Sequence, residues 1–219
     1  MLMDEEDASG STGVIAVYDG RRHILTVAGV GDSMCVLSRS GKAVMLNRMH
    51  RLDNADEVER IKRAGGTVIN KRYLFLPFTL YCDATFPKIT IAIDFPRVNG
   101  LLAISRAFGD TQFKPERDDD NPTQASDGLV ISTPEVCSEH ITPMTEFAII
   151  ATDGLWDVMT PQMAVTFVRN LLHKHRDLEE AAKGLSKEAL TRGSVDNVTV
   201  LIMSFHFSDE GKIKAGKQK

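Results

Sequence analysis

The sequence is poor in cysteine and contains no long apolar run. Its three cysteines, Cys35, Cys82 and Cys137, lie far apart and form no Cys-x-x-Cys pair, which argues against a disulfide framework and a structural zinc site. We therefore expect each of them to be a small buried hydrophobic residue. No apolar run reaches about 18 residues, so no membrane-spanning helix is expected. Cysteine usage of this kind predicts an intracellular protein, cytoplasmic or nuclear.

The sequence also lacks the basic stripe of a nucleic-acid-binding protein and the apolar stretch of a signal peptide. The net charge is -4 and the pI is about 5.9. The first residues, MLMDEEDASG, are acidic and contain no apolar segment, so no secretory leader is expected. The basic tail GKIKAGKQK is interpreted as solvated chain. Neither nucleic acid nor a membrane is therefore an expected partner.

The length of the chain suits one hydrophobic core. Of its 219 residues, 42% are hydrophobic and 26% are charged, which is enough for one sizeable core. No internal repeat or long low-complexity tract divides the sequence. We expect a single domain over residues 1–219, with flexible ends at residues 1–10 and 208–219.

Short apolar runs predict strands in the first half of the chain and at two later points. Tyr18-Asp19-Gly20 separates the first two runs and carries an Asp-Gly hairpin signal. Residues 67–97 are expected to form short strands and loops, and residues 114–128 a polar surface loop. The other predicted strands cover residues 14–17, 24–30, 34–37, 43–46, 147–151 and 198–203.

Three helices are predicted from periodicity and end signals. The first spans residues 54–64, with Asn54 able to cap it and Glu57 three residues later. The second begins at Thr160, and the third covers residues 178–192. In the third helix, the residues expected to face inward are Leu178, Ala181, Ala182, Leu185 and Ala189. Because strands come first and helices come late and grouped, we expect an α+β layered architecture instead of a doubly wound sheet.

Four aspartates stand at the ends of apolar runs. They are Asp32, Asp110, Asp153 and Asp196. A carboxylate at the mouth of a buried strand is partly desolvated and needs a cation or hydrogen-bond donors. Several such groups converging would form an oxygen-rich site for Mg²⁺ or Mn²⁺. Taken one at a time, each aspartate is better explained as the cap of a turn or a helix.

These aspartates belong to an ordered set of short motifs. The motifs are Ser-Thr-Gly at 11–13, Gly-Asp-Ser at 31–33, Glu-Arg-Ile and Gly-Gly within 59–66, Val-Asn-Gly at 98–100, Ser-Arg-Ala-Phe-Gly-Asp at 105–110, Pro-Glu-Val at 134–136, Asp-Gly-Leu-Trp-Asp-Val-Met at 153–159 and Asp-Asn-Val-Thr at 196–199. In this order and spacing, the set resembles the type 2C metal-dependent protein phosphatases. The resemblance runs from about Ser11 to Met203.

The resemblance implies both a fold and a reaction. The fold is α+β, a four-layer β-sandwich of antiparallel sheets flanked by helices, here without the N-terminal strands and helices of the family. The implied reaction is hydrolysis of phosphoserine and phosphothreonine in phosphoprotein substrates by a water bound to a binuclear Mg²⁺ or Mn²⁺ centre. A divalent metal lowers the pKa of its water and neutralises charge on the phosphoryl oxygens.

The resemblance also implies roles for individual residues. Asp153 and Asp196 match the two late metal-ligand aspartates, and Asp32 matches the aspartate of a third, weaker metal. Asp110 and Asp157 match acidic residues close to the metal-bound waters, so their implied role is indirect.

Two segments that the family carries upstream of the position matched by Ser11 have no counterpart here. One holds a phosphate-binding arginine and a Glu-Asp pair. The other, Asp-Gly-His-Gly-Gly, supplies the aspartate that bridges both metals and a candidate acid histidine. Only ten residues precede Ser11, and none of them fits. Asp19 is a tempting substitute, but it falls inside the predicted hairpin and is interpreted as a turn residue.

Two further positions depart from the family pattern. His50 lies where the family often has an Asp-His-Lys-Pro run, but Met49 replaces the aspartate, so a surface or structural histidine is the favoured interpretation. The stretch between Gly66 and Val98 is longer than expected and sits where these enzymes carry a variable flap. Its residues 70–97 either cover a core or present a docking surface, and both alternatives stay open.

Two functions are consistent with these observations. The first is a phosphatase of which this chain is one part, the chain alone being weak or inactive. The second is a pseudophosphatase that keeps the sandwich as a scaffold or interaction module. Survival of four aspartates at strand ends favours the first. A sheet without its neighbouring elements would leave an edge or an apolar face uncovered, which predicts self-association or binding of a complementing N-terminal segment.

Overall fold

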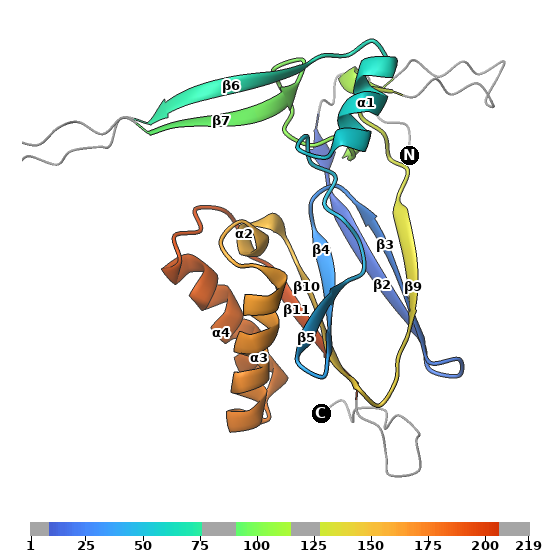
Figure 1. The fold of residues 1–219 in the computed structure, drawn as a ribbon, viewed down its shortest axis with the longest axis vertical. Coiled ribbons are helices and arrows are strands. Elements are labelled where there is room, and N and C mark those ends of the chain that lie inside the picture. Colours follow the sequence, from blue (N-terminus) through green and yellow to red (C-terminus); the bar gives the residue numbers. More distant parts are fainter. Residues whose placement is uncertain (1–8, 76–90, 115–127, 206–219) are drawn as a thin grey trace, which may run out of the picture. The chain divides into compact units, whose positions relative to one another are not determined.

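The computed structural model describes residues 9–75, 91–114 and 128–205. The chain forms two compact units, one from Met1–Gly10 and His50–Ile131 and the other from Ser11–Met49 and Ser132–Lys219 (Figure 1). The expectation of one domain stays a prediction. Several expectations fall outside the described residues. They concern Cys82, nearly all of the loop expected at 114–128, and both terminal segments apart from residues 9 and 10. Among the described residues, no helix is long and apolar enough to cross a membrane.

The larger unit contains two antiparallel sheets. One has the strand order β11-β10-β4-β5, and the other has the order β2-β3-β9. All six strands predicted outside residues 67–97 are present, each within a few residues of its expected bounds, whereas β9 was not predicted. The bounds are Gly13–Asp19 for β2, Ile24–Val30 for β3, Met34–Arg39 for β4, Lys42–Met45 for β5, Glu135–His140 for β9, Thr145–Ala151 for β10 and Val200–Ser204 for β11.

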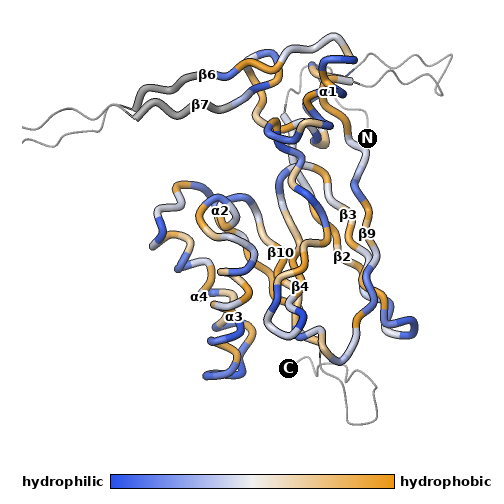
Figure 2. The backbone as a smooth tube through the Cα atoms, in the orientation of Figure 1, coloured by the Kyte–Doolittle hydropathy of each residue, from blue (hydrophilic) through white to orange (hydrophobic). Residues whose placement is uncertain are grey.

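The central strands of the four-stranded sheet are buried on both faces, which explains their unbroken apolar sequence. In β4, Met34 and Val36 point into one hydrophobic cluster and Cys35 and Leu37 into another. The second cluster also contains Leu25 of β3, so it fills the space between the two sheets. Figure 2 shows the apolar residues concentrated along these strands. Burial raises the pKa of the Cys35 thiol to about 12, and the charge of Cys137 adds to this, as expected for an inert buried cysteine.

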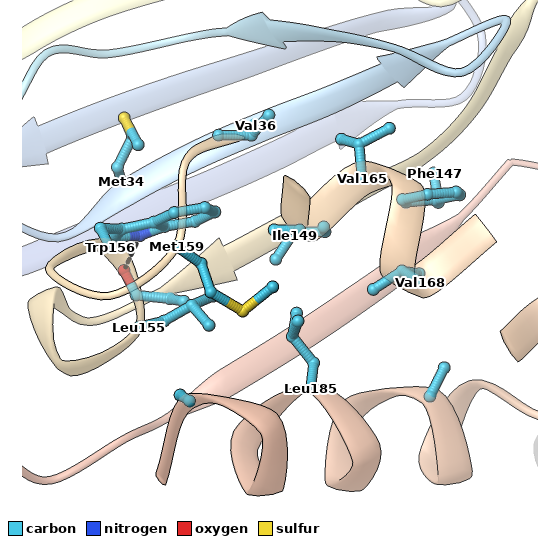
Figure 3. Close-up of a cluster of buried hydrophobic side chains, with 14 residues drawn as sticks. Met34, Val36, Phe147, Ile149, Leu155, Trp156, Met159, Val165, Val168 and Leu185 are labelled. Carbon is cyan, nitrogen blue, oxygen red and sulfur yellow. Dashed lines mark hydrogen bonds between the residues drawn. The ribbon is translucent and has the colours of Figure 1, made fainter. Parts of the chain in front are cut away.

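The first cluster lies between the four-stranded sheet and three helices (Figure 3). The helices are α2 at Asp153–Trp156, α3 at Pro161–His175 and α4 at Leu178–Thr191. The Thr160 side chain caps α3 by accepting a hydrogen bond from the Met163 N–H at 3.3 Å, as its sequence predicted. Leu185 of α4 is fully buried, but Leu178 is 36% exposed, so its predicted inward position was wrong. Leu178 is the first residue of the helix and precedes the buried residues Ala181, Leu185 and Ala189 that face the core.

The outer face of the three-stranded sheet is apolar and exposed. Ile15, Ala28 and Val136 lie opposite one another in adjacent strands, and Val17 follows on the same face. The exposed fractions of Ile15, Val17 and Val136 are 63%, 60% and 59%. Helices α3 and α4 pack on the other sheet, through β4, β5 and β11. An exposed apolar row of this kind is an uncovered face of the sort expected from the sequence.

The smaller unit is built around α1 and a long hairpin. The hairpin pairs Val68 with Val98 and continues to the pair of Phe75 and Ile91, so the strands expected within 67–97 are present. The remainder of the proposed flap, residues 76–90, lies outside the described residues. The elements are α1 at Ala55–Arg63, β6 at Val68–Phe75, β7 at Ile91–Val98, β8 at Phe108–Gly109 and a 3-10 turn at Thr111–Phe113, with β1 at Gly10–Ser11 bordering the unit.

A buried ion network holds α1 in this unit. The Glu57 carboxylate is nearly inaccessible to solvent and accepts hydrogen bonds from Arg106 Nη2 at 2.5 Å and from Arg60 Nη2 at 3.2 Å. Arg60 also donates to the Gly128 carbonyl at 2.6 Å. Asn54 occupies the N-cap position without a side-chain cap hydrogen bond. The predicted capping box was therefore wrong, because Glu57 turns inward to the two arginines instead of back to the helix start.

The network fixes the charge state of Glu57. Burial by itself raises the pKa of this carboxyl. The hydrogen bond from Arg106 and the charges of Arg106 and Arg60 outweigh burial and lower the pKa from 4.5 to about 2. Because the folded pKa lies below the ordinary value, the stabilisation is fully present above about pH 4.5 and is lost as the pH falls towards 2.

We expect Glu57→Gln to lower the free energy of unfolding at neutral pH by about 3 kcal/mol, because the buried Arg60 and the partly buried Arg106 would lose their counter-charge. The deficit should shrink as the pH falls from about 4.5 towards 2, where the native carboxyl becomes protonated. Urea unfolding at several pH values measures both effects. Glu59→Gln on the exposed side of α1 is the matched control. A deficit that stays constant with pH would contradict the assignment.

Candidate active site

Asp153 and Asp196 lie beyond the same end of the four-stranded sheet. Ala151, the last residue of β10, is paired with Val200, the first residue of β11. Asp153 follows Ala151 by two residues and opens α2, whereas Asp196 precedes Val200 by four. Because these strands are antiparallel, the chain that leaves β10 and the chain that enters β11 meet at this end of the sheet.

Thr152 joins the two segments. Its hydroxyl donates to the Asn197 carbonyl at 3.2 Å and accepts a hydrogen bond from the Thr199 N–H at 3.1 Å. The Thr152 N–H in turn donates to the Thr199 carbonyl at 3.2 Å. The residues directly before Asp153 and directly after Asp196 are therefore tied together. Sequence analysis missed Thr152, and its only signal was a hydroxyl residue between an apolar strand and Asp-Gly.

Gly154 allows the two segments to approach closely. A Cβ atom at this position would lie 2.5 Å from the Asn197 carbonyl oxygen, so only glycine fits without a backbone shift. The Ser194 hydroxyl donates to the Gly154 carbonyl at 2.6 Å and adds a further link. At the other end of α2, the buried Trp156 indole N–H donates to the Ala151 carbonyl of β10 at 2.9 Å. These contacts fix α2 against both the end of β10 and the loop of Asp196.

Asp32 and Asp157 lie at the same end of the larger unit. Met34 is paired with Ala151, and Asp32 precedes Met34 by two residues, so Asp32 and Asp153 flank one antiparallel pair. Asp157 is the C-cap of α2, four residues after Asp153, and this spacing puts both side chains on one face of the turn. Asp32 is half-buried and Asp157 is exposed.

Asp110 belongs to the smaller unit. It is 7% exposed and adopts a left-handed conformation with a φ of 50°. Its N–H donates to the Ser9 carbonyl at 2.9 Å, and its carboxylate lies against Gly10. Within this unit, Asp110 therefore sits beside the first described residues of the chain.

The carboxylates at the sheet end are of the donor type that a Mg²⁺ or Mn²⁺ site requires. Carboxylate oxygens are the donors that Mg²⁺ and Mn²⁺ prefer, and Asp153 and Asp196 stand on segments tied to each other. Asp196 is exposed, and its Oδ1 accepts a hydrogen bond from the Asn197 N–H at 2.7 Å. Across residues 9–75, 91–114 and 128–205, no three His, Cys, Asp or Glu side chains are grouped closely enough to hold a metal. The oxygen donors present are of the kind that these metals bind, but too few of them lie close together to form a complete site.

Asp19 is a turn residue, as its sequence predicted. Its Oδ1 accepts hydrogen bonds from the N–H groups of Arg21 and Arg22 at 2.9 and 3.2 Å. It ends β2, whose first residue, Gly13, is paired with Val30 just before Asp32. At about 3.3 Å per residue, Asp19 lies about 20 Å along the strand from that end.

His50 is a structural residue. Its side chain is 1% exposed, which excludes the surface alternative. Its carbonyl accepts hydrogen bonds from the N–H and the hydroxyl of Ser105, both at 3.0 Å. These bonds connect it to the first residue of the Ser-Arg-Ala-Phe-Gly-Asp motif.

A family model described as Protein phosphatase 2C matches residues 1–198. The chain belongs to the protein phosphatase 2C family. "Probable protein phosphatase 2C 69" of Arabidopsis thaliana is 38% identical over 197 residues, which cover 90% of this chain and 44% of the relative. "Protein phosphatase 2C 57" of the same plant is 32% identical over 235 residues, 98% of this chain and 54% of the relative. The chain thus spans about half the length of the curated relatives it matches.

Solved protein phosphatase 2C structures share the fold. A phosphatase from a pathogenic strain of Toxoplasma gondii has a TM-score of 0.64 at 26% identity, over 88% of this chain and 50% of that one. The serine-threonine phosphatase 2C from Toxoplasma gondii has a TM-score of 0.63 at 24% identity, over 92% of this chain and 60% of that one. The predicted α+β sandwich and the predicted family are both confirmed.

We expect Gly154→Ala to destabilise this chain by about 1–3 kcal/mol, since the new methyl group would collide with the Asn197 carbonyl. The clash should outweigh the gain in helix propensity of at most about 1 kcal/mol. Gly20→Ala is the matched control, because its Cβ would meet Tyr18 at an ordinary 3.6 Å. Thermal unfolding followed by circular dichroism compares the two. Equal midpoints would show that residues 154 and 197 are not in close contact.

Proposed function

We propose that this chain forms the part of a metal-dependent protein serine/threonine phosphatase that carries its late metal-ligand aspartates. Membership of the protein phosphatase 2C family supports the reaction class. The observation that carries the proposal is the Thr152 linkage, which keeps the segments of Asp153 and Asp196 side by side. The substrates would be phosphoserine and phosphothreonine in proteins.

Each aspartate has a distinct part in this proposal. Asp153 and Asp196 would hold Mg²⁺ or Mn²⁺, and Asp32 would serve a third, weaker site. When bound, the metal supplies an acidified water and neutralises charge on the phosphoryl oxygens. Asp157, one helical turn from Asp153, would orient water beside the metal.

The chain alone is expected to be a poor enzyme. Mg²⁺ takes six oxygen ligands in near-octahedral geometry, so the protein must place several carboxylates even when waters complete the shell. The described residues bring together fewer than three candidate ligands. A further carboxylate, supplied by a complementing segment, would be needed to hold two cations close to each other against their repulsion.

A scaffold function is the alternative, and the exposed sheet face favours it. Ile15, Val17 and Val136 form an apolar row on β2, β3 and β9 without a charged side chain among them. Such a row suits a second copy of the chain or a complementing segment. A pseudophosphatase would use this face and need no metal, whereas the enzyme would use it to complete its domain.

The aspartate roles are tested in a protein in which the family's N-terminal segment is joined ahead of this chain. Asp153→Ala and Asp196→Ala should each lower kcat by at least about a hundredfold, equivalent to roughly 2.7 kcal/mol of barrier. Asp19→Ala, which removes a carboxylate about 20 Å along β2, should leave kcat within about twofold. Phosphopeptide hydrolysis with Mn²⁺ measures all three. Full activity of the Asp153 and Asp196 variants would refute the proposal.

Calorimetric titration of the 219-residue chain with Mn²⁺ tests its expected weakness. An incomplete donor set should give weak binding, with a Kd of about 1 mM or higher, and little phosphopeptide turnover. Analytical ultracentrifugation of the same sample reports self-association through the apolar face. Tight binding of two Mn²⁺ ions with ordinary turnover would contradict the expectation and reveal ligands elsewhere in the chain.

A further inference from the structure

The larger unit contains a cavity of about 670 Å³ at the end of the four-stranded sheet opposite to Asp153. The start of β10, the end of β11, the last turns of α3 and the first residue of α4 line it. These elements can be followed in Figure 1. Phe147 is the cavity-lining residue of β10 that comes nearest to Ala151, and it precedes Ala151 by four residues. At about 3.3 Å per residue, the cavity therefore lies about 13 Å or more from the sheet end that carries the aspartates.

The floor of the cavity is apolar and rigid. Phe147 and Phe205 line it and are only 2% and 5% exposed, since most of each side chain is packed into the neighbouring clusters. Leu172 and the partly exposed Leu178 line its sides. An apolar ligand group entering here would therefore meet a preformed surface with no main-chain rearrangement.

One wall of the cavity is basic. Arg169, Leu172 and His173 line it from one face of α3, as their spacing of i, i+3 and i+4 requires, and Arg176 lines it from the end of the helix. Arg176 closes the helix in a left-handed conformation, and its N–H donates to the Leu172 carbonyl at 3.0 Å. Two permanent cations and one titratable ring therefore follow each other along the wall.

Among the described residues that line the cavity, the one carboxylate is already engaged. Glu146 accepts hydrogen bonds from Ser38 Oγ at 2.6 Å, the Gly41 N–H at 3.1 Å and Arg169 Nε at 3.0 Å. It orients Arg169 through Nε, so the terminal guanidinium nitrogens keep donor capacity. Arg176 has no side-chain ion pair or hydrogen bond among the described residues. Even with His173 neutral, the lining carries a net charge of +1, from Arg169 and Arg176 against Glu146, in a chain of net charge -4.

We propose that this cavity is a docking site for a short acidic peptide segment of a partner protein, with an apolar residue between its carboxylates. A volume of about 670 Å³ accommodates a few side chains and is typical of a ligand pocket. The carboxylates would pair with Arg176 and Arg169, and arginine binds carboxylates in a bidentate manner. The apolar residue would rest on Phe147 and Phe205. The inference concerns binding alone and does not require the chain to hydrolyse phosphate esters.

Binding is measured on the 219-residue chain by fluorescence anisotropy. The probe is a fluorescein-labelled peptide, Glu-Asp-Leu-Phe-Glu-Asp. Its control replaces the two apolar residues by serine. Arg176→Glu should weaken binding of the probe by about tenfold or more, because it reverses a charge that would face the ligand. Lys174→Glu makes the same charge change two residues away on α3, outside the cavity lining, and should change the affinity by about twofold or less.

Amide chemical-shift mapping with the unchanged protein keeps the test independent of any folding defect in the variants. The probe should shift the signals of Glu146, Leu178 and Ser204, and should leave Asp153 unaffected. Three results would overturn the proposal: shifts confined to other surfaces, equal losses in both charge variants, or equal affinity for the serine control. The first would show that the peptide binds elsewhere. The second would show attraction by overall charge alone, and the third would show that the apolar floor is not used.

Discussion

The linkage made by Thr152 is the constraint on which the candidate site depends. One hydroxyl donates to Asn197 and accepts from Thr199, so it binds the exit of one strand to the entry of its neighbour. Regular strand pairing ends at Ala151 and Val200, and one further main-chain hydrogen bond joins the Thr152 N–H to the Thr199 carbonyl. The Thr152 hydroxyl adds two hydrogen bonds to this one and so keeps the carboxylate-bearing segments together beyond the strand ends.

The layers behind this linkage supply its rigidity. Strands β4 and β10 are buried on both faces, between the second sheet on one side and the helices on the other. A strand packed in this way cannot slide by one residue, because the slip would exchange its two sets of side chains between two different clusters. The end of β10, and therefore the position of Asp153, is fixed by packing along its whole length.

The sequence predicted the elements whose signal is local and strong. Helices α3 and α4 follow from a capping threonine and regular apolar spacing, and β10 follows from an uninterrupted apolar run. Strand β9 was missed because only Val136 and Cys137 are apolar in the segment 135–140, which therefore has neither an apolar run nor a regular alternation. Helix α2 was missed because four residues are too few to show a period.

Interactions between distant residues set the limit of prediction for the site. The five aspartates were singled out from sequence, and the sheet register explains why Asp32, Asp153 and Asp196 share one end. Glu57 was assigned to a helix cap because its partner Arg106 lies far along the chain and leaves no local trace. The contact of Gly154 with Asn197 was equally invisible, since both residues are common in ordinary turns.

The chain between Asp153 and Asp196 contains both α3 and α4, and Thr152 closes this segment at its base. The two aspartates therefore meet only after the helical pair has folded back on the sheet. Closing a loop of this size has an entropic cost, and the contacts around Thr152 offset this cost only when they form together. In a folding chain, the approach of the segments that carry these carboxylates would be among the last events, so the candidate site would form only after the helices have packed on the sheet.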